Sequence, residues 1–202
     1  TDLVRWLAVL IAAGLASQAA TARAQCDATV ARCLALQLWV GPGVDEGWLK
    51  AQLGEANLRL AAVGLGVEVV DVATRPASLA RIETVAQRNR LLELGKQTPL
   101  RVFVVDHLAD AEDPRTDRRG VTWRRRDDFA VILWTGANRW VLAHELGHVL
   151  GLPHSREHTS IMNKTVRAIL PSQLVYTARE QPTMKRTASR LLAAHRLREK
   201  PR

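Results

Sequence analysis

The chain has 202 residues, of which 47% are hydrophobic and 24% are charged, with two cysteines and a formal net charge of +9. These values are typical of a globular protein and exclude a collagen-like, a wholly disordered and a disulfide-dense chain. The length corresponds to about one domain, which can bury a core without covalent cross-links.

The first 24 residues have the pattern of a secretory signal peptide. Arg5 precedes an apolar run over 6–16, and small residues follow up to Ala22 and Ala24. This order of a charged start, an apolar middle and a small-residue end is typical of a cleaved leader. The alternative is a membrane anchor, but a span needs about 20 apolar residues. We therefore expect a signal peptide at 1–24 and a secreted protein, periplasmic or extracellular, that is not an integral membrane protein.

The two cysteines, Cys26 and Cys33, lie just after this leader. In an oxidising compartment they can close a small disulfide loop. Two unpaired thiols are the alternative that the sequence leaves open.

The rest of the chain alternates between strand-like and helical patterns. In chain order, the pattern predicts a strand at 34–40, a helix at 45–63, a strand at 67–72, a helix at 78–94 with Ser78 as its N-cap, a strand at 100–105, a polar surface loop at 106–119, strands at 120–124 and 129–134, a helix at 138–150, an irregular segment to about 183 and a final helix at 183–198. Helices between successive strands indicate an α/β (α+β) fold with a largely parallel sheet. The short, charged segment 120–124 is typical of an edge strand.

The positive charge is concentrated at the C-terminal end. Residues 164–202 contain ten lysines and arginines against two glutamates. Such a tail favours an acidic partner, such as a polymer or a membrane surface, although a solvated helix face explains it too. Tyr176 is the only aromatic residue of this segment, so base stacking has little support and we expect no specific nucleic acid partner.

The segment Ala143–His154 carries the chemistry. His144 and His148 are four residues apart on an expected helix, so both imidazoles lie on one face, one turn apart. Two nitrogens from one helix can then bind a single zinc ion at about 2.0–2.1 Å. Glu145 is rotated by about 100° around the helix axis and can reach a water on the metal instead.

Gly151 is expected to end this helix in the left-handed conformation and to turn the chain sharply. The turn can return His154 to the metal as a third ligand. Three histidine ligands leave one tetrahedral position open for water, which is the arrangement of a catalytic zinc site. Glu145 can then act as the general base that takes the proton from this water.

The segment HELGHVLGLPH resembles the zinc signature of the metzincin metallopeptidases, His-Glu-x-x-His-x-x-Gly-x-x-His. Met162 follows at the distance of the Met-turn of that family, and Ser155 after the third histidine is similar to the matrixin branch. The resemblance implies a twisted mixed five-stranded sheet with a long active-site helix in one metallopeptidase domain, 25–202. It divides this domain into an N-terminal subdomain, 25–151, and a small C-terminal subdomain, 152–202, that ends in a helix.

The resemblance also implies a monomeric bacterial zinc endopeptidase with one catalytic zinc ion and a protein or peptide substrate. By similarity, the substrate is expected along the edge segment Gly120, Val121, Thr122 and Trp123. Leu170 and Tyr176 are expected in the wall of the specificity pocket, and for Tyr176 the alternatives are oxyanion stabilisation and plain packing.

Two other functions remain open at this point. One is an exported zinc-containing binding protein that docks acidic polymers or membrane surfaces with little turnover. The other is a zinc hydrolase that acts on a non-peptide amide, because the metal motif does not select the acyl donor.

Overall fold

The computed structural model describes residue 30 and the ranges 32–95, 99–126, 128–165, 169–193 and 197–199. The expected signal peptide, 1–24, and Cys26 lie outside the described residues. Cys33 is buried at the start of the first strand and is disulfide-bonded. Within the described residues, no helix combines the length and the apolar character that a membrane span requires.

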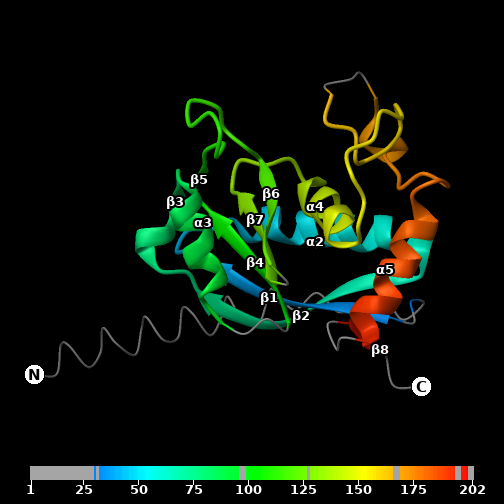
Figure 1. Ribbon diagram of the computed structural model, residues 1–202, viewed down its shortest axis with the longest axis horizontal. Helices are drawn as coiled ribbons and strands as arrows, with labels where there is room; N and C mark the ends of the chain where they lie inside the picture. Colours follow the sequence, from blue (N-terminus) through cyan, green and yellow to red (C-terminus); the bar gives the residue numbers. More distant parts are fainter. Residues whose placement is uncertain are drawn as a thin grey trace, which may run out of the picture.

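A mixed sheet forms the centre of the molecule (Figure 1). Its strand order is β2 (Leu65–Thr74), β1 (Arg32–Val40), β4 (Leu100–Val105), β7 (Asp128–Trp134) and β6 (Gly120–Arg125). The first four strands are parallel, and β6 at the edge runs antiparallel to β7. The expected five-stranded mixed sheet is therefore confirmed. It has one addition, the short strand β8 (Leu197–Glu199), which pairs antiparallel with the start of β1.

Helices cover both faces of this sheet, so its central strands are apolar on both sides. In β7, Val131 and Leu133 pack with α2 (Glu46–Leu60) and α4 (Val141–Val149), while Ala130 and Ile132 pack with α3 (Val85–Leu92) on the opposite face. The larger core lies on the α2 and α4 side, which is the side that builds the site.

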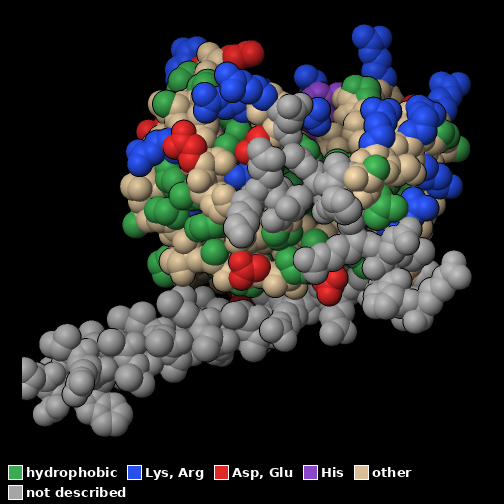
Figure 2. Space-filling model, turned by 60° about the horizontal axis from the view of Figure 1, so that its bottom comes forward, with side chains coloured by type: hydrophobic (Ala, Val, Ile, Leu, Met, Phe, Trp, Pro, Cys, Tyr) green, Lys and Arg blue, Asp and Glu red, His purple; other side chains and the backbone are tan. Residues whose placement is uncertain are grey.

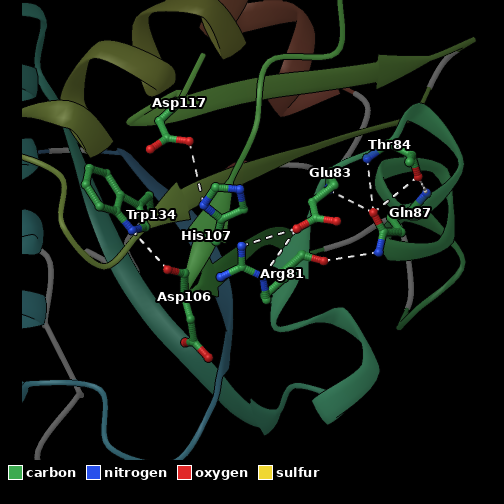
Figure 3. Close-up of polar contacts among 8 residues, drawn as sticks. All are labelled: Arg81, Glu83, Thr84, Gln87, Asp106, His107, Asp117 and Trp134. Carbon is green, nitrogen blue, oxygen red and sulfur yellow. Dashed lines mark hydrogen bonds and ion pairs between the residues drawn. The ribbon is translucent and has the colours of Figure 1, made fainter. Parts of the chain in front are cut away.

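The helix expected at 78–94 starts later than the sequence analysis placed it. Ser78 lies in a short 3₁₀ turn, η2 (Ala77–Leu79), and the two-residue strand β3 (Arg81–Ile82) follows. The N-cap of α3 is Thr84, whose hydroxyl accepts from the Gln87 backbone N–H at 3.2 Å (Figure 3). The Gln87 side chain accepts in return from the Thr84 N–H at 3.0 Å. This reciprocal capping box is a stronger start signal than the lone Ser78.

The loop expected at 106–119 is not wholly irregular, because β5 (His107–Leu108) pairs parallel with β3. Figure 3 shows Arg81 and His107 of this small second sheet, and beside them Trp134 of β7, whose indole N–H donates to the Asp106 carbonyl at 3.0 Å. Nearby, Nδ1 of His107 lies 3.6 Å from a carboxylate oxygen of Asp117 (Figure 3).

After α4 the chain has little regular structure. Its described regular elements there are the 3₁₀ turn η3 (Pro171–Gln173), the helix α5 (Gln181–Ala193) and β8. Earlier in the chain, a 3₁₀ turn η1 (Ala61–Val63) follows α2. The final helix expected at 183–198 is wrong at its end, since 197–199 form β8. The subdomain boundary at 151 stays a prediction, and β8 returns the chain from the expected C-terminal subdomain to β1.

Candidate metal centre and active site

The start of α4 is held by side chains from α2. The buried Gln52 accepts a hydrogen bond from the Leu142 N–H at 3.0 Å and donates to the Asn138 carbonyl at 2.8 Å. A helix leaves its first four N–H groups without partners inside the helix, and α4 has no side-chain cap of its own. Gln52 supplies the missing acceptor and thereby fixes the position of the helix that carries the histidines.

The end of α4 is closed by a sharp turn at Gly151, where φ is +87°. The Leu152 N–H bonds the Gly147 carbonyl at 2.9 Å, and the Gly151 N–H bonds the His148 carbonyl at 3.0 Å. This pair of bonds is the Schellman arrangement, which favours glycine because the left-handed conformation strains other residues. The turn directs the following residues back past the helix.

Three imidazoles meet beside this turn. One ligand atom each from His144, His148 and His154 can be chosen so that all lie within 4.8 Å of one another. The ring centroids are 4.8 to 5.5 Å apart. Two of the histidines come from α4 and the third from the segment after Gly151, as the sequence motif predicts.

The tautomers of two rings are set by backbone carbonyls. Nδ1 of His144 lies 2.7 Å from the Ile161 carbonyl oxygen, and Nδ1 of His148 lies 2.7 Å from the Leu152 carbonyl oxygen. A carbonyl only accepts, so each Nδ1 carries the proton and each Nε2 keeps its lone pair for a metal. Burial lowers the pKa of His148 and of His154, so the neutral form that binds metal is favoured. This donor set fits a zinc ion.

Met162 packs against α4 at Gly147, where the two segments are in close contact. Its side chain is fully buried, and a Cβ placed on Gly147 would lie 2.3 Å from the Met162 sulfur. The Met162 backbone is held on both sides, because its N–H donates to the Ser160 hydroxyl at 3.0 Å and its carbonyl accepts from the Ser155 N–H at 3.1 Å. The turn therefore places the Ile161 carbonyl, which orients His144, through packing against α4.

The side chain of Glu145 projects from α4 toward the edge strand β6. Its residue is 4% exposed, and the Thr122 hydroxyl lies 2.9 Å from both its carboxylate Oε2 and its backbone carbonyl. Burial raises the pKa of Glu145 to about 7, while hydrogen bonds from the Thr122 hydroxyl and backbone act in the opposite direction. A carboxylate with a pKa near neutrality is suited to accept and return a proton.

A cavity of about 520 Å³ opens in front of these groups. His144, Glu145 and His154 line it, together with the start of β6 and the segment after Met162. It is a cleft between the sheet edge and the C-terminal part of the chain, large enough for peptide side chains.

The residues expected to contact substrate lie in different places. Gly120 lines the cavity, whereas Val121 and Trp123 pack on the α3 side of the sheet. Leu170 is 66% exposed and stands between two lining residues, Ile169 and Pro171. Tyr176 is buried, and its hydroxyl donates to the Ala143 carbonyl, a contact that favours the packing alternative.

Two contacts of the site escaped the sequence analysis. The role of Gln52 has no sequence signal, because an internal glutamine of α2 reads as a surface residue. Thr122 was expected at the substrate edge, and its hydrogen bond to Glu145 depends on how β6 packs against α4.

Comparisons with known proteins give one family match and several similar solved structures. A family model described as Matrixin matches residues 108–179. Among solved structures, metalloproteinase-II from Bacteroides fragilis has a TM-score of 0.55 at 17% identity, over 81% of this chain and 55% of that chain. The chain thus spans about half the length of that protein. An archaemetzincin from Methanopyrus kandleri has a TM-score of 0.49 at 15% identity, over 80% of this chain and 97% of that chain.

A search of curated proteins gave no match. The matrixin match covers the segment with all three histidines, Glu145 and Met162, and the fold is shared with a metalloproteinase. Residues 108–179 are thus similar to the matrixin family, and the chain has a fold similar to that of a metalloproteinase.

Proposed function

We propose that this chain is a zinc-dependent endopeptidase with one catalytic zinc ion and with Glu145 as its general base. One observation carries the proposal: three imidazoles converge, and two of them line one cleft with a buried carboxylate at the free edge of the sheet. Neither a structural histidine cluster nor a closed metal site needs a carboxylate at that place.

Nε2 of His144 and of His148, together with a ring nitrogen of His154, would hold the zinc ion. Three protein ligands leave a coordination position open, and the bound ion would supply Lewis acidity to a substrate carbonyl. Glu145 accepts the proton of the attacking water and returns it to the leaving amine, which is general base and then general acid catalysis. The Thr122 hydroxyl and N–H hold the carboxylate in place for both transfers.

The substrate backbone has a natural place along β6. This strand is the last of the sheet in the described part of the chain, so its outer N–H and C=O groups have no strand partner there. An extended peptide can add to such an edge through backbone hydrogen bonds, which require little sequence specificity. Gly120 at the start of β6 lines the same cleft as Glu145, so an added peptide would pass the catalytic groups.

We also propose that the protein is exported through residues 1–24 and acts as a monomer in the periplasm or outside the cell. The basic tail supports a contact with an acidic surface. Lys185, Arg186 and Arg190 of α5 are exposed, and none has an ion pair among the residues that the structure describes. Salt-sensitive binding to anionic vesicles would support this contact, and salt-independent binding would contradict it.

The test of the peptidase is a cleavage profile on a peptide library with the zinc-loaded protein. We expect cleavage by the wild type, none after chelation, and none by Glu145→Ala with its zinc retained. Cleavage by Glu145→Ala at the wild-type rate would contradict the mechanism. A protein that cleaves no peptide, yet hydrolyses small amides, would favour the non-peptide alternative.

A further inference from the structure

The cleft in front of the three histidines is lined by several cationic side chains. Arg118 and Arg119 reach it from the segment before β6, and Lys164 reaches it from the segment after Met162. Glu145 and Asp117 are the acidic residues among its described lining residues. In Figure 2, histidine side chains lie among Lys and Arg side chains at the upper edge of the molecule. Three cationic and two acidic side chains thus lie next to the reacting groups.

The three cations are not equivalent, because Arg118 already has a structural partner. It is hydrogen-bonded to Asp110, a carboxylate that also accepts from the Glu112 N–H at 2.8 Å. Arg119 and Lys164 are both exposed, and neither has an ion pair within the described ranges. These two charges are available to a ligand.

Both available cations stand on fixed backbone. The Arg119 carbonyl accepts from the Trp134 N–H at 3.0 Å, which ties it to the last residue of β7. The neighbour of Lys164, Asn163, bonds the Glu157 carbonyl through its side chain at 3.1 Å and the Ser160 carbonyl through its N–H at 3.1 Å. The two charges are therefore presented from two anchored segments to the same cleft.

Both available cations lie close to the reacting groups, because Arg119 and Lys164 line the same cavity as His154 and Glu145. A negatively charged group bound by Lys164 or Arg119 therefore lies in the cleft that holds these groups.

We propose that Arg119 and Lys164 bind the carboxylate of a substrate side chain, so that the enzyme prefers peptides with Asp or Glu next to the cleaved bond. The inference rests on the proposed peptidase function. A peptide is the favoured anionic ligand because the same cleft opens onto the free edge of β6. A non-peptide polyanion would meet the charges but would leave this edge unused.

The test measures binding and cleavage separately. Glu145→Ala, loaded with zinc, is titrated with two labelled peptides that differ only by Glu against Gln next to the bond that the wild type cleaves. An exposed ion pair contributes at most about 1 kcal/mol, or about fivefold in affinity. We expect about fivefold tighter binding of the Glu peptide at low salt, and loss of this preference at high salt.

The decisive variant is the charge reversal Arg119→Glu/Lys164→Glu in the same background, which should favour the Gln peptide. Its matched control is Lys50→Glu/Arg90→Glu, which changes the net charge equally at exposed positions of α2 and α3 outside the cleft. The control should keep the Glu preference. Loss of preference in both variants would show a general charge effect and overturn the subsite.

Cleavage of the two peptides by the active protein distinguishes a failure of the proposed subsite from a failure of the proposed peptidase activity. Equal binding and equal cleavage of both peptides would overturn the subsite and leave the peptidase intact. Failure of the wild type to cleave any peptide would overturn the peptidase instead. Tighter binding of a non-peptide polyanion than of the Glu peptide, again lost on charge reversal, would assign the charges to that ligand and contradict the proposal.

Discussion

Replacing Gly147 with alanine should separate the packing of the Met-turn from the helical preference of α4. The added Cβ would lie 2.3 Å from the Met162 sulfur and 3.1 Å from Tyr176 Cε1. Both neighbours are buried, so neither can swing into solvent. Overpacking of this kind costs about 1–3 kcal/mol, whereas alanine in place of glycine within a helix gains roughly 0.5–1 kcal/mol. The expected net effect is destabilisation by up to about 2 kcal/mol.

Gly54→Ala is the matched control. Gly54 lies inside α2, is exposed, and has no atom within 4 Å of the added Cβ. This variant should be more stable than the wild type by roughly 0.5–1 kcal/mol. Urea unfolding of both variants in the same zinc buffer should therefore give shifts of opposite sign. Equal shifts would refute the packing argument.

The substitution Gly147→Ala should also change the binding of zinc at the histidines. A displaced Met162 moves the Ile161 carbonyl away from Nδ1 of His144, which lies 2.7 Å from it. Loss of such a contact to a metal-binding histidine typically lowers metal affinity by about 10- to 100-fold. A competition titration should show zinc binding weakened by about tenfold in Gly147→Ala and unchanged in Gly54→Ala. In a double-mutant cycle, Met162→Ala should cost less in the Gly147→Ala background than in the wild type, and strict additivity would contradict the contact.

Three further predictions concern the edge strand, the acidic loop and the metal. Thr122→Val keeps the shape of the side chain and removes the hydroxyl that holds Glu145, so kcat should fall by about tenfold at unchanged zinc content; an unchanged kcat would remove Thr122 from the mechanism. The pKa of Asp110 is lowered, first by the Glu112 N–H and also by Arg118. Its ionised form therefore stabilises the folded state at neutral pH, and this contribution is lost as the pH falls below about 4. Asp110→Asn should lower the Tm at pH 7 and show a smaller further drop on acidification than the wild type, and parallel Tm curves would contradict this. Chelation should abolish hydrolysis and lower the Tm, because zinc binds the folded state and links α4 to His154; a Tm that chelation leaves unchanged would argue against a bound metal.

The cluster of three histidines could be predicted from the sequence because its determinants are local. The spacing of His144 and His148 defines one helix face, and Gly151 marks the turn that returns His154. The Schellman bonds at Gly151 occur where the sequence places the end of the helix. Strong local signals of this kind do not depend on the rest of the fold.

The elements that differ from the sequence-based expectation depend on competing local signals or on strand partners far away in the sequence. The helix begins after Thr84 and not at Ser78, because Thr84-x-x-Gln87 forms a capping box, whereas Ser78 has no such partner three residues on. For 197–199, helical periodicity continued from α5, and only the pairing with β1 makes this segment a strand. The two-residue strands β3 and β5 define each other across 24 intervening residues and have no pattern of their own.

The sequence alone does not indicate that cationic side chains gather in the cleft. Arg119 and Lys164 are far apart in sequence, and each belongs to a polar segment without a motif. Their common position in one cavity follows from the packing of the β6 edge against the segment after Met162. Most of the net positive charge lies in 164–202, and Lys164, the first residue of that segment, lines the cleft together with Arg119 from the segment before β6.

The most direct test of the central claim is the coordination of zinc in the purified, zinc-loaded protein, measured by X-ray absorption. The account predicts one zinc per chain with three imidazole nitrogens at about 2.0–2.1 Å and one lighter oxygen ligand. His154→Ala should reduce the imidazole count to two, and Glu145→Ala should leave it at three. Fewer than three imidazoles in the wild-type protein, or an unchanged count in His154→Ala, would contradict the account.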